Sequence, residues 1–443
     1  MGTKFGKLLD SLHASFWFIP TLMVGIAILL SLVTIGIDQR LEADIISDFG
    51  WAYALGPNGS RAILSAIAGS MVTVATTAFS ITIVALQLAS SQFGPRLLRN
   101  FIQDTGNQIV LGTFISTFVY SLLVLRTING VAENEFVPHI AVTCGIGMAI
   151  ASIGVLIYFI HHSAISIQVD HVISEVGNEL EKVIDRLFPK QIGRGASEHR
   201  AEPLPSDVPA DFDRKATAIQ STSSNYVQAI DTDQLMQVAT EANLLLQLQH
   251  RPGDFVIKGS PLVAVYPIES VGKKLVKQIN NAFVLGAQRT DQQDVEFSIN
   301  QLVEISVRAL SPGINDPFTA IRCIDQLSAA LCHLAQREVP SAYRYDDQNQ
   351  LRVIAKPVTF ADIMDTAFNQ IRQYGRTSVA VMMRLLEAIA VIAPCTHIKA
   401  DRAALLHHAN MIEHGSQKGI TEESDRKDVK ERYLAAIKAI GQV

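Results

Sequence analysis

The sequence predicts an α-helical membrane protein in which four transmembrane helices precede a cytosolic α+β region. Two observations support this prediction. The first 165 residues contain four long uncharged stretches, and the rest of the chain mixes charged and apolar residues as soluble proteins do. A helix needs about 20 apolar residues to cross a hydrocarbon core of about 30 Å. The 443 residues also exceed what one hydrophobic core usually holds, which indicates more than one domain.

The expected transmembrane domain covers residues 1–165, with helices at about 15–37, 62–95, 105–125 and 136–160. Any one of these stretches would also suit a buried helix of a soluble protein, but four in succession favour a membrane domain. The first stretch is longer than the ~7–15 apolar residues of a cleaved signal peptide, so we expect a retained anchor.

The placement of lysine and arginine predicts the orientation, because these residues are enriched in cytoplasmic loops. Lys4 and Lys7 precede the first stretch, and Arg96 and Arg99 lie between the second and the third. We therefore expect the N-terminus in the cytoplasm. After an even number of membrane helices, the C-terminus is expected there too.

The second stretch is unusual because it is rich in small and hydroxyl residues. Such residues let helices approach closely, which favours a packing helix within one protomer or at a subunit contact, and we expect a homo-oligomer. The same residues would also suit a water-lined path. An ion-coupled transporter is less favoured, because the four stretches carry no charge in mid-membrane. The candidate pore-lining or helix-packing residues are Thr73, Thr76, Thr77, Ser80 and Gln87.

Four segments carry a resemblance to a known family. They are SFWFIPTLM at 15–23, AGSMVTVATTAFSITIVALQLASSQFGPRLLRNFIQDTGNQIVLGTF at 68–114, GVLIYFIHH at 154–162 and RALSPGINDPFTA at 308–320. Together they resemble the bacterial membrane proteins of domain-of-unknown-function family 2254, over nearly the whole chain. The resemblance implies a multi-pass protein of a bacterial inner membrane with a cytosolic C-terminal region. It implies no catalytic residues, because the family has no assigned chemistry.

The chain after residue 165 is expected to contain five segments. They are a helical connector at 166–190, a linker at 191–224, a small β module at 225–267, a mainly helical cytosolic domain at 268–415 and a polar tail with a short helix at 416–443.

Strand patterns are clearest in the β module, where 226–231 and 244–250 alternate and Pro252-Gly253 predicts a turn. We expect a small barrel-like fold there. Further expected elements are a helix ending at Leu310 and capped by Thr290 or Asp291, a hairpin at 344–353, a helical stretch over 360–392, and a short tail helix near 429–440.

The SPGINDP segment predicts a helix start, because Asp316 suits an N-cap and the following proline suits the first turn. A helix N-terminus binds anions, but the carboxylate of Asp316 would occupy its N–H groups. The residues at issue are Arg308, Asn315, Asp316 and Arg322, which form either a structural turn or a ligand or gating contact.

Composition and motifs exclude some classes of function. A net charge of −5 offers no basic surface for nucleic acid. The four cysteines lack metal-like spacing and are expected to be reduced thiols. No catalytic or nucleotide-binding motif occurs, so we expect no enzyme, no cofactor and no metal.

The leading functional hypothesis is a channel-like or solute-permeation protein in the lipid bilayer, gated by its cytosolic domain. Its further partner would be an unidentified ion, a small ligand or a cytosolic protein. The alternative is a non-conducting scaffold or sensor that recruits a cytosolic partner. A membrane enzyme is a third, weaker hypothesis.

Overall fold

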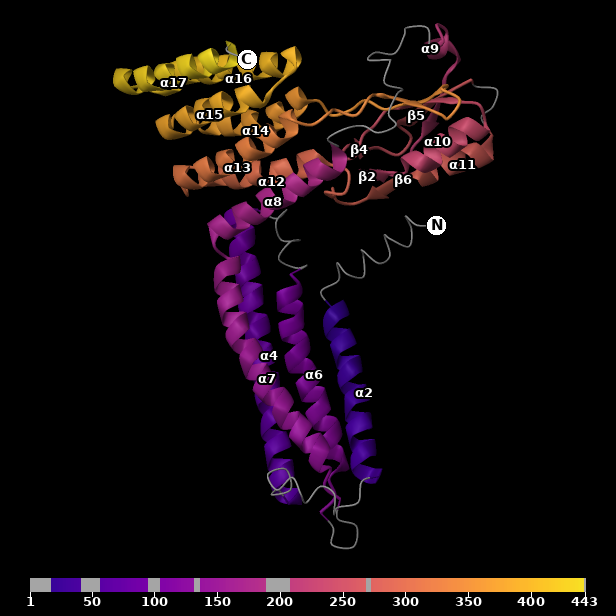
Figure 1. Cartoon of the computed structure of the whole chain (residues 1–443), viewed down its shortest axis with the longest axis vertical. Coiled ribbons are helices and arrows are strands. Elements are labelled where there is room, and N and C mark those ends of the chain that lie inside the picture. Colours follow the sequence, from indigo (N-terminus) through magenta and orange to yellow (C-terminus); the bar gives the residue numbers. More distant parts are fainter. Residues whose placement is uncertain are drawn as a thin grey trace. The chain divides into compact units, whose positions relative to one another are not determined.

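The structure is a computed structural model that describes residues 17–40, 56–94, 104–130, 136–188, 208–267 and 272–441. The chain divides into two compact units, unit 1 at Met1–His171 and unit 2 at Val172–Val443 (Figure 1). The orientation signals Lys4, Lys7, Arg96 and Arg99 lie outside the described residues, as does much of the expected linker.

The described residues of unit 1 form four helices that are long and apolar enough to cross a membrane, which confirms the four predicted spans. They are α2 (Phe18–Arg40), α4 (Pro57–Phe93), α6 (Thr105–Thr127) and α7 (His139–Ser166). The second helix begins earlier than expected, because Pro57 suits a first helical turn and the helix accommodates the charge of Arg61. The Arg61 Nη2 donates a hydrogen bond to the Ile128 carbonyl oxygen at 2.8 Å.

The centre of unit 1 is α6, which packs against α2, α4 and α7 (Figure 1). In its most apolar stretch 56% of the residues are buried, compared with 17% in α4. Phe114 and Tyr120 of α6 are fully buried. The hydroxyl of Tyr120 donates to the Ala141 carbonyl at 3.0 Å and lies 3.0 Å from the Thr34 hydroxyl. The other three helices thus each contact this one central helix.

Carboxylates join the helices at both ends of unit 1. At the end of α2, the two oxygens of Asp38 accept hydrogen bonds from the Ile140 and Ala141 N–H groups, both at 2.9 Å. At the opposite end, Asp104 caps α6 and lies 2.6 Å from the His162 ring nitrogen. The start of α2 and the end of α7 therefore lie at the same end of the bundle.

Unit 2 contains two sheets. The five-stranded sheet has the order β1 (Thr217–Gln220), β5 (Pro261–Tyr266), β3 (Leu245–Leu248), β8 (Leu351–Ile354), β7 (Tyr343–Tyr345), and the three-stranded sheet has the order β4 (Phe255–Val256), β2 (Asn225–Ile230), β6 (Phe283–Gly286). All pairs are antiparallel except β3 with β8. The predicted strands and the 344–353 hairpin are confirmed, but the hairpin joins the sheet of the β module through β8. The sheets share one apolar core with α10 (Thr232–Glu241) and α11 (Lys273–Ala282), and a short helix, α9 (Phe212–Lys215), precedes β1.

The remaining helices of unit 2 pack in layers beside the sheets (Figure 1). They are α8 (Val169–Leu187), α12 (Val295–Ala309), α13 (Pro317–Ala335), α14 (Phe360–Tyr374), α15 (Val379–Ile392), α16 (Lys399–Gly419) and α17 (Glu423–Gly441). The apolar stripe of α8, which the sequence assigned to a connector, is buried from Val172 to Ile184. This helix is therefore part of the core of unit 2.

Two expected helix starts are wrong, and one expected helical stretch is divided in two. Asp294, not Thr290 or Asp291, caps α12, because its carboxylate accepts the Phe297 N–H at 3.2 Å. The stretch over 360–392 is helical as expected, but it forms two helices that are separated after Gly375, where a Cβ would lie 2.6 Å from Val381. The tail helix begins at Glu423, six residues before its expected start.

A buried histidine couples the stability of unit 2 to pH. His408 of α16 is 1% exposed, its Nε2 lies 3.0 Å from Asp365, and its Nδ1 has no hydrogen-bond partner among the described residues. Burial lowers the pKa of His408 to about 4, although Asp365 acts in the opposite direction. His407 and Arg372 are the positive neighbours that lower the pKa further.

We predict that the protein loses stability as the pH falls from about 6.5 toward 4, because the unfolded chain then binds a proton at His408 that the folded chain excludes. The loss from this group is on the order of 2–3 kcal/mol. Denaturant unfolding of the detergent-purified protein across this pH range measures it. His408→Gln should flatten the pH dependence of the unfolding free energy. His407→Gln, which replaces the exposed neighbour, is the control and should leave that dependence in place. Equal pH profiles for the wild type and His408→Gln would contradict this account.

Candidate functional site

The five residues singled out on the second membrane helix share one exposed face of α4. Thr73, Thr76, Thr77, Ser80 and Gln87 are all exposed in unit 1. Their spacing of three, four or seven residues places them on one side of a helix. Gly69 continues this face, and a Cβ there would meet no atom within 4 Å. We call this surface the hydroxyl face of α4.

The opposite face of α4 packs into unit 1. Leu64, Ala68, Met71, Ala78 and Ala89 are buried there. This bundle-facing surface is also built from small and apolar residues, so the chemistry of the two faces differs chiefly by the hydroxyl groups. In the described part of unit 1, α4 packs against α6 and α7 with its buried side and leaves the hydroxyl face exposed.

Each hydroxyl on the exposed face is bonded to its own helix. Thr73 Oγ1 donates to the Gly69 carbonyl at 3.0 Å, Thr77 Oγ1 to the Thr73 carbonyl at 2.9 Å, and Ser80 Oγ to the Thr76 carbonyl at 2.8 Å. A hydroxyl has one donor hydrogen and two acceptor lone pairs. The hydroxyl donors are used by the backbone, so the hydroxyl groups present oxygen acceptors, and Gln87 adds an uncharged amide that both donates and accepts.

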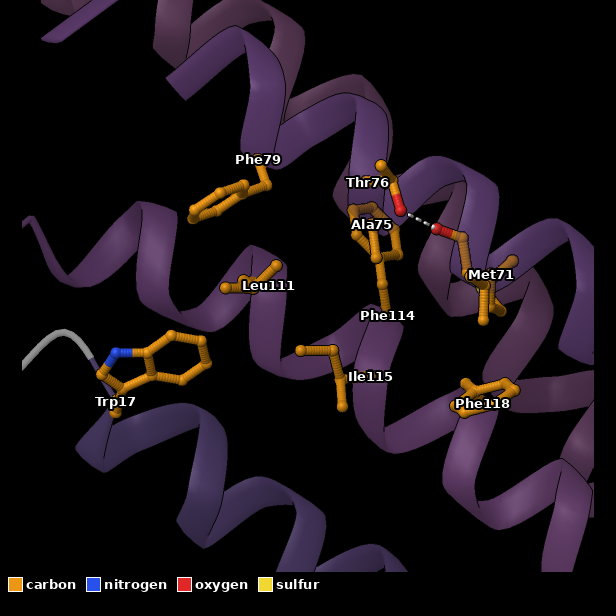
Figure 2. Close-up of a pocket in the computed structure, with 10 residues that line it drawn as sticks. Trp17, Met71, Ala75, Thr76, Phe79, Leu111, Phe114, Ile115 and Phe118 are labelled. Atoms are coloured by element: carbon orange, nitrogen blue, oxygen red, sulfur yellow. Dashed lines mark hydrogen bonds between the residues drawn. The ribbon is translucent and has the colours of Figure 1, made fainter. Parts of the chain in front are cut away.

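An apolar groove of about 360 Å³ runs beside this face, where α2 and α4 flank α6. Figure 2 shows Leu111 and Ile115 of α6 between Trp17, at the start of α2, and Phe79 of α4. Thr76 contributes a polar atom at the groove, and its hydroxyl donates to the Val72 carbonyl at 2.9 Å (Figure 2). The groove offers almost only apolar contacts, so it suits hydrocarbon and not a polar solute.

The four residues singled out in and beside the SPGINDP segment lie in unit 2, at or near the turn between α12 and α13. Asp316 caps α13, and its carboxylate accepts hydrogen bonds from the Thr319 hydroxyl at 2.6 Å and from the Phe318 and Thr319 N–H groups at 3.1 Å. These bonds, the hydroxyl bond first, lower the pKa of Asp316. Asn315 adopts a positive φ of 50°, which asparagine tolerates.

The two arginines lie outside that segment, on the flanking helices. Arg308, near the end of α12, is 3.4 Å from Glu304, and Arg322 lies one turn after Phe318 on α13. The free N–H groups at the start of α13 bind Asp316, so this turn offers little to an added anion.

A polar pocket in unit 2 was missed by sequence reasoning. Its volume is about 360 Å³, and its lining includes His250, Arg251, Asp254, Lys356 and Asp362. The pocket forms where the turn after β3 meets the start of α14. Its residues lie about a hundred positions apart in the chain, so no local motif could reveal it. The PGD turn was the available signal, but it predicted only a strand connection.

Arg251 is the best-fixed side chain of this pocket. Its Nη2 lies 2.7 Å from Glu296, and its Nη1 lies 3.8 Å from Asp362. Burial raises the pKa of Glu296, and the charge of Arg251 opposes that shift. Among the described residues, no group of three or more His, Cys, Asp or Glu side chains could hold a metal ion. Because basic and acidic side chains both line the pocket, it suits a small polar ligand that carries groups of both charges.

Comparison with known proteins agrees with the membrane architecture. Residues 13–391 match the family described as "Predicted membrane protein (DUF2254)". Uncharacterized proteins of Mycobacterium bovis and Mycobacterium tuberculosis are each 31% identical over 432 residues, which are 95% of this chain and 79% of each relative. No solved structure matches the chain.

Proposed function

The chain belongs to the DUF2254 family of predicted membrane proteins, and from this premise we propose that it is a homo-oligomeric, channel-like solute-permeation protein. The observation that carries the proposal is the hydroxyl face of α4, which unit 1 leaves uncovered. In the oligomer, the α4 helices of several copies present this face to a common path, and unit 2 controls its opening.

The length and composition of α4 support its role as the assembly helix. Its 37 residues make a helix of about 55 Å, which exceeds the hydrocarbon core of about 30 Å. Gly, Ser and Thr on an exposed face allow close approach of helices, which is how membrane helices associate in the absence of a hydrophobic driving force.

The hydrogen bonds of α4 indicate the class of solute. The exposed hydroxyls donate to their own backbone, so a solute meets oxygen acceptors and no fixed charge. The oxygen atoms of such a surface can replace part of the water around a cation, or around a neutral molecule that itself carries hydrogen-bond donors. The proposed solutes are therefore small cations or small neutral molecules.

Unit 2 is proposed as the control element, with the polar pocket around Arg251 as its ligand site. α7 ends at Ser166 and α8 begins at Val169, so two residues join a membrane helix to a core helix of unit 2. A ligand that shifts the packing of unit 2 would act on the membrane helices through this short link.

The proposed location is the inner membrane of a bacterium, with both termini in the cytoplasm. Lys4 and Lys7 before α2, and Arg96 and Arg99 between α4 and α6, support this orientation under the positive-inside rule. The alternating direction of the four helices is consistent with an even number of spans.

Flux through the purified protein in liposomes tests the proposed function. We predict uptake of K⁺ or of small polyols above that of empty liposomes, and a change of about fivefold in Thr77→Val, taking ~1 kcal/mol for the lost hydroxyl contact. Thr82→Val is the matched control, because its hydroxyl donates to Ala78 on the partly buried side of the same helix. Neither variant should lose the fold, since each hydroxyl bonds only its own backbone.

Two outcomes of this experiment would refute the proposal. One is the absence of flux of any tested ion or neutral solute, with and without candidate ligands, which would favour a scaffold. The other is an equal change of flux in Thr77→Val and Thr82→Val, which would show that the hydroxyl face does not line the path.

Thiol labelling tests the proposed orientation. Asn58, at the start of α4, and Asn349, between β7 and β8, are both exposed. In a variant without the four native cysteines, an impermeant reagent outside intact cells should label Asn58→Cys. The same reagent should reach Asn349→Cys only after the membrane is permeabilised. The reverse pattern would invert the orientation.

A further inference from the structure

Two of the four cysteines of the chain lie side by side in unit 2. Cys332 is near the end of α13, and Cys395 is in the short 3-10 helix η3 (Ala393–Cys395), which follows α15. The thiol of each donates to the Val391 carbonyl oxygen, with the sulfur atoms at 3.7 and 3.8 Å from it. A further hydrogen bond joins the two thiols. Two elements that are distant in the sequence thus bring their sulfur atoms together.

The other two cysteines are placed differently. Cys323, also on α13, is 0% exposed, and burial raises the pKa of its thiol. Cys144 lies in the membrane helix α7. In contrast, Cys332 and Cys395 are both partly exposed, and Val391 beside them is 61% exposed. The pair therefore combines two adjacent sulfur atoms with access to small molecules in the surrounding water.

The two thiols of the pair differ in how readily they lose a proton. Burial raises the pKa of Cys332 to about 12, and the hydrogen bond and the charge of Cys395 act in the same direction. The thiolate is the form of cysteine that reacts with oxidants. We therefore expect Cys395 to react first, while Cys332 stays protonated beside it as the second thiol.

Metal binding does not account for the pair. Zinc in proteins takes three or four side-chain ligands. Among the described residues, no group of three or more His, Cys, Asp or Glu side chains could hold a metal ion. Two adjacent, partly exposed thiols without a third ligand instead suit the exchange between thiols and a disulfide.

We propose that Cys332 and Cys395 form a reversible redox site, in which a peroxide converts the two thiols into a disulfide. The Cys395 thiolate attacks one peroxide oxygen, the O–O bond breaks, and the leaving hydroxide takes up the proton that Cys395 released, which gives a sulfenic acid and water. The Cys332 sulfur then attacks the sulfenic sulfur, the S–O bond breaks, and the hydroxide leaves as water with the proton of Cys332. Two thiols and one hydrogen peroxide thus give one disulfide and two water molecules.

The disulfide joins the end of α13 to the connection between α15 and α16. α13 packs against α15, and η3 also contacts α17. Oxidation therefore adds a covalent bond between elements that already pack together, and a reductant removes it. The redox site lies wholly within unit 2, and the inference does not depend on solute permeation.

Peptide mapping after oxidation tests the redox site. The detergent-purified protein is exposed to hydrogen peroxide, its free thiols are alkylated, and it is digested with trypsin without reduction. We predict a disulfide between peptides 323–337 and 385–399 and a fall of free thiols from four to two, both reversed by reductant. Cys323→Ala is the matched control, because it leaves Cys332 as the one cysteine of the first peptide and should form the same link.

The variants of the pair test the order of the two steps. In Cys332→Ser, the sulfenic acid of Cys395 has no second thiol to react with, so the sulfenic acid reagent dimedone should label Cys395 more strongly than in the wild type. In Cys395→Ser, dimedone should not label Cys332, because burial keeps this thiol protonated.

Three results would overturn the redox site. One is the retention of four free thiols at a peroxide concentration that fully oxidises dithiothreitol in the same solution. Another is that the linked peptides come from a disulfide-bonded dimer on a non-reducing gel, which would place the bond between copies. The third is oxidation of Cys395 in the wild type without a link to Cys332.

Discussion

The packing of α6 against three other membrane helices is the contact on which unit 1 depends. A lipid environment provides no hydrophobic driving force between helices, so close packing and hydrogen bonds must hold the bundle together. α6 supplies both, through the buried rings of Phe114 and Tyr120 and through the cap formed by Asp104. The helices α2 and α4 attach to α6 on separate sides, which leaves the groove between them and commits only one face of α4 to the protomer.

This arrangement explains how α4 can expose hydroxyl groups on a face that no other helix of the protomer covers. Backbone carbonyls accept the exposed hydroxyls, so the helix does not need a partner to satisfy them. What the face lacks is covering contact, which we propose that further copies of the chain provide. The α12–α13 turn of unit 2 has the same combination of features. Its polar atoms form hydrogen bonds within the turn, and the side chains of Ile314 and Phe318 are exposed.

The sequence was sufficient wherever a feature is local. Charge-free windows located the membrane helices, alternation located β2 and β3, and the Asp316-Pro317 pair identified the start of α13. It was insufficient wherever residues distant in the chain meet. Ala78 and Thr77 are neighbours of similar size, and only the position of α6 decides which is buried. The pairing of β8 with β3 and the polar pocket likewise depend on contacts that local patterns do not encode.

Cysteine cross-linking between copies tests most directly whether α4 assembles through its hydroxyl face. In membranes from cells that express a variant without native cysteines, a short bifunctional thiol reagent should join copies through Thr73→Cys. The same reagent should leave Thr82→Cys, on the partly buried side of the helix, as a monomer. Two results would contradict assembly through the hydroxyl face. A monomer in both variants would mean that this face contacts lipid, and equal cross-linking in both would mean that copies meet without preference for it.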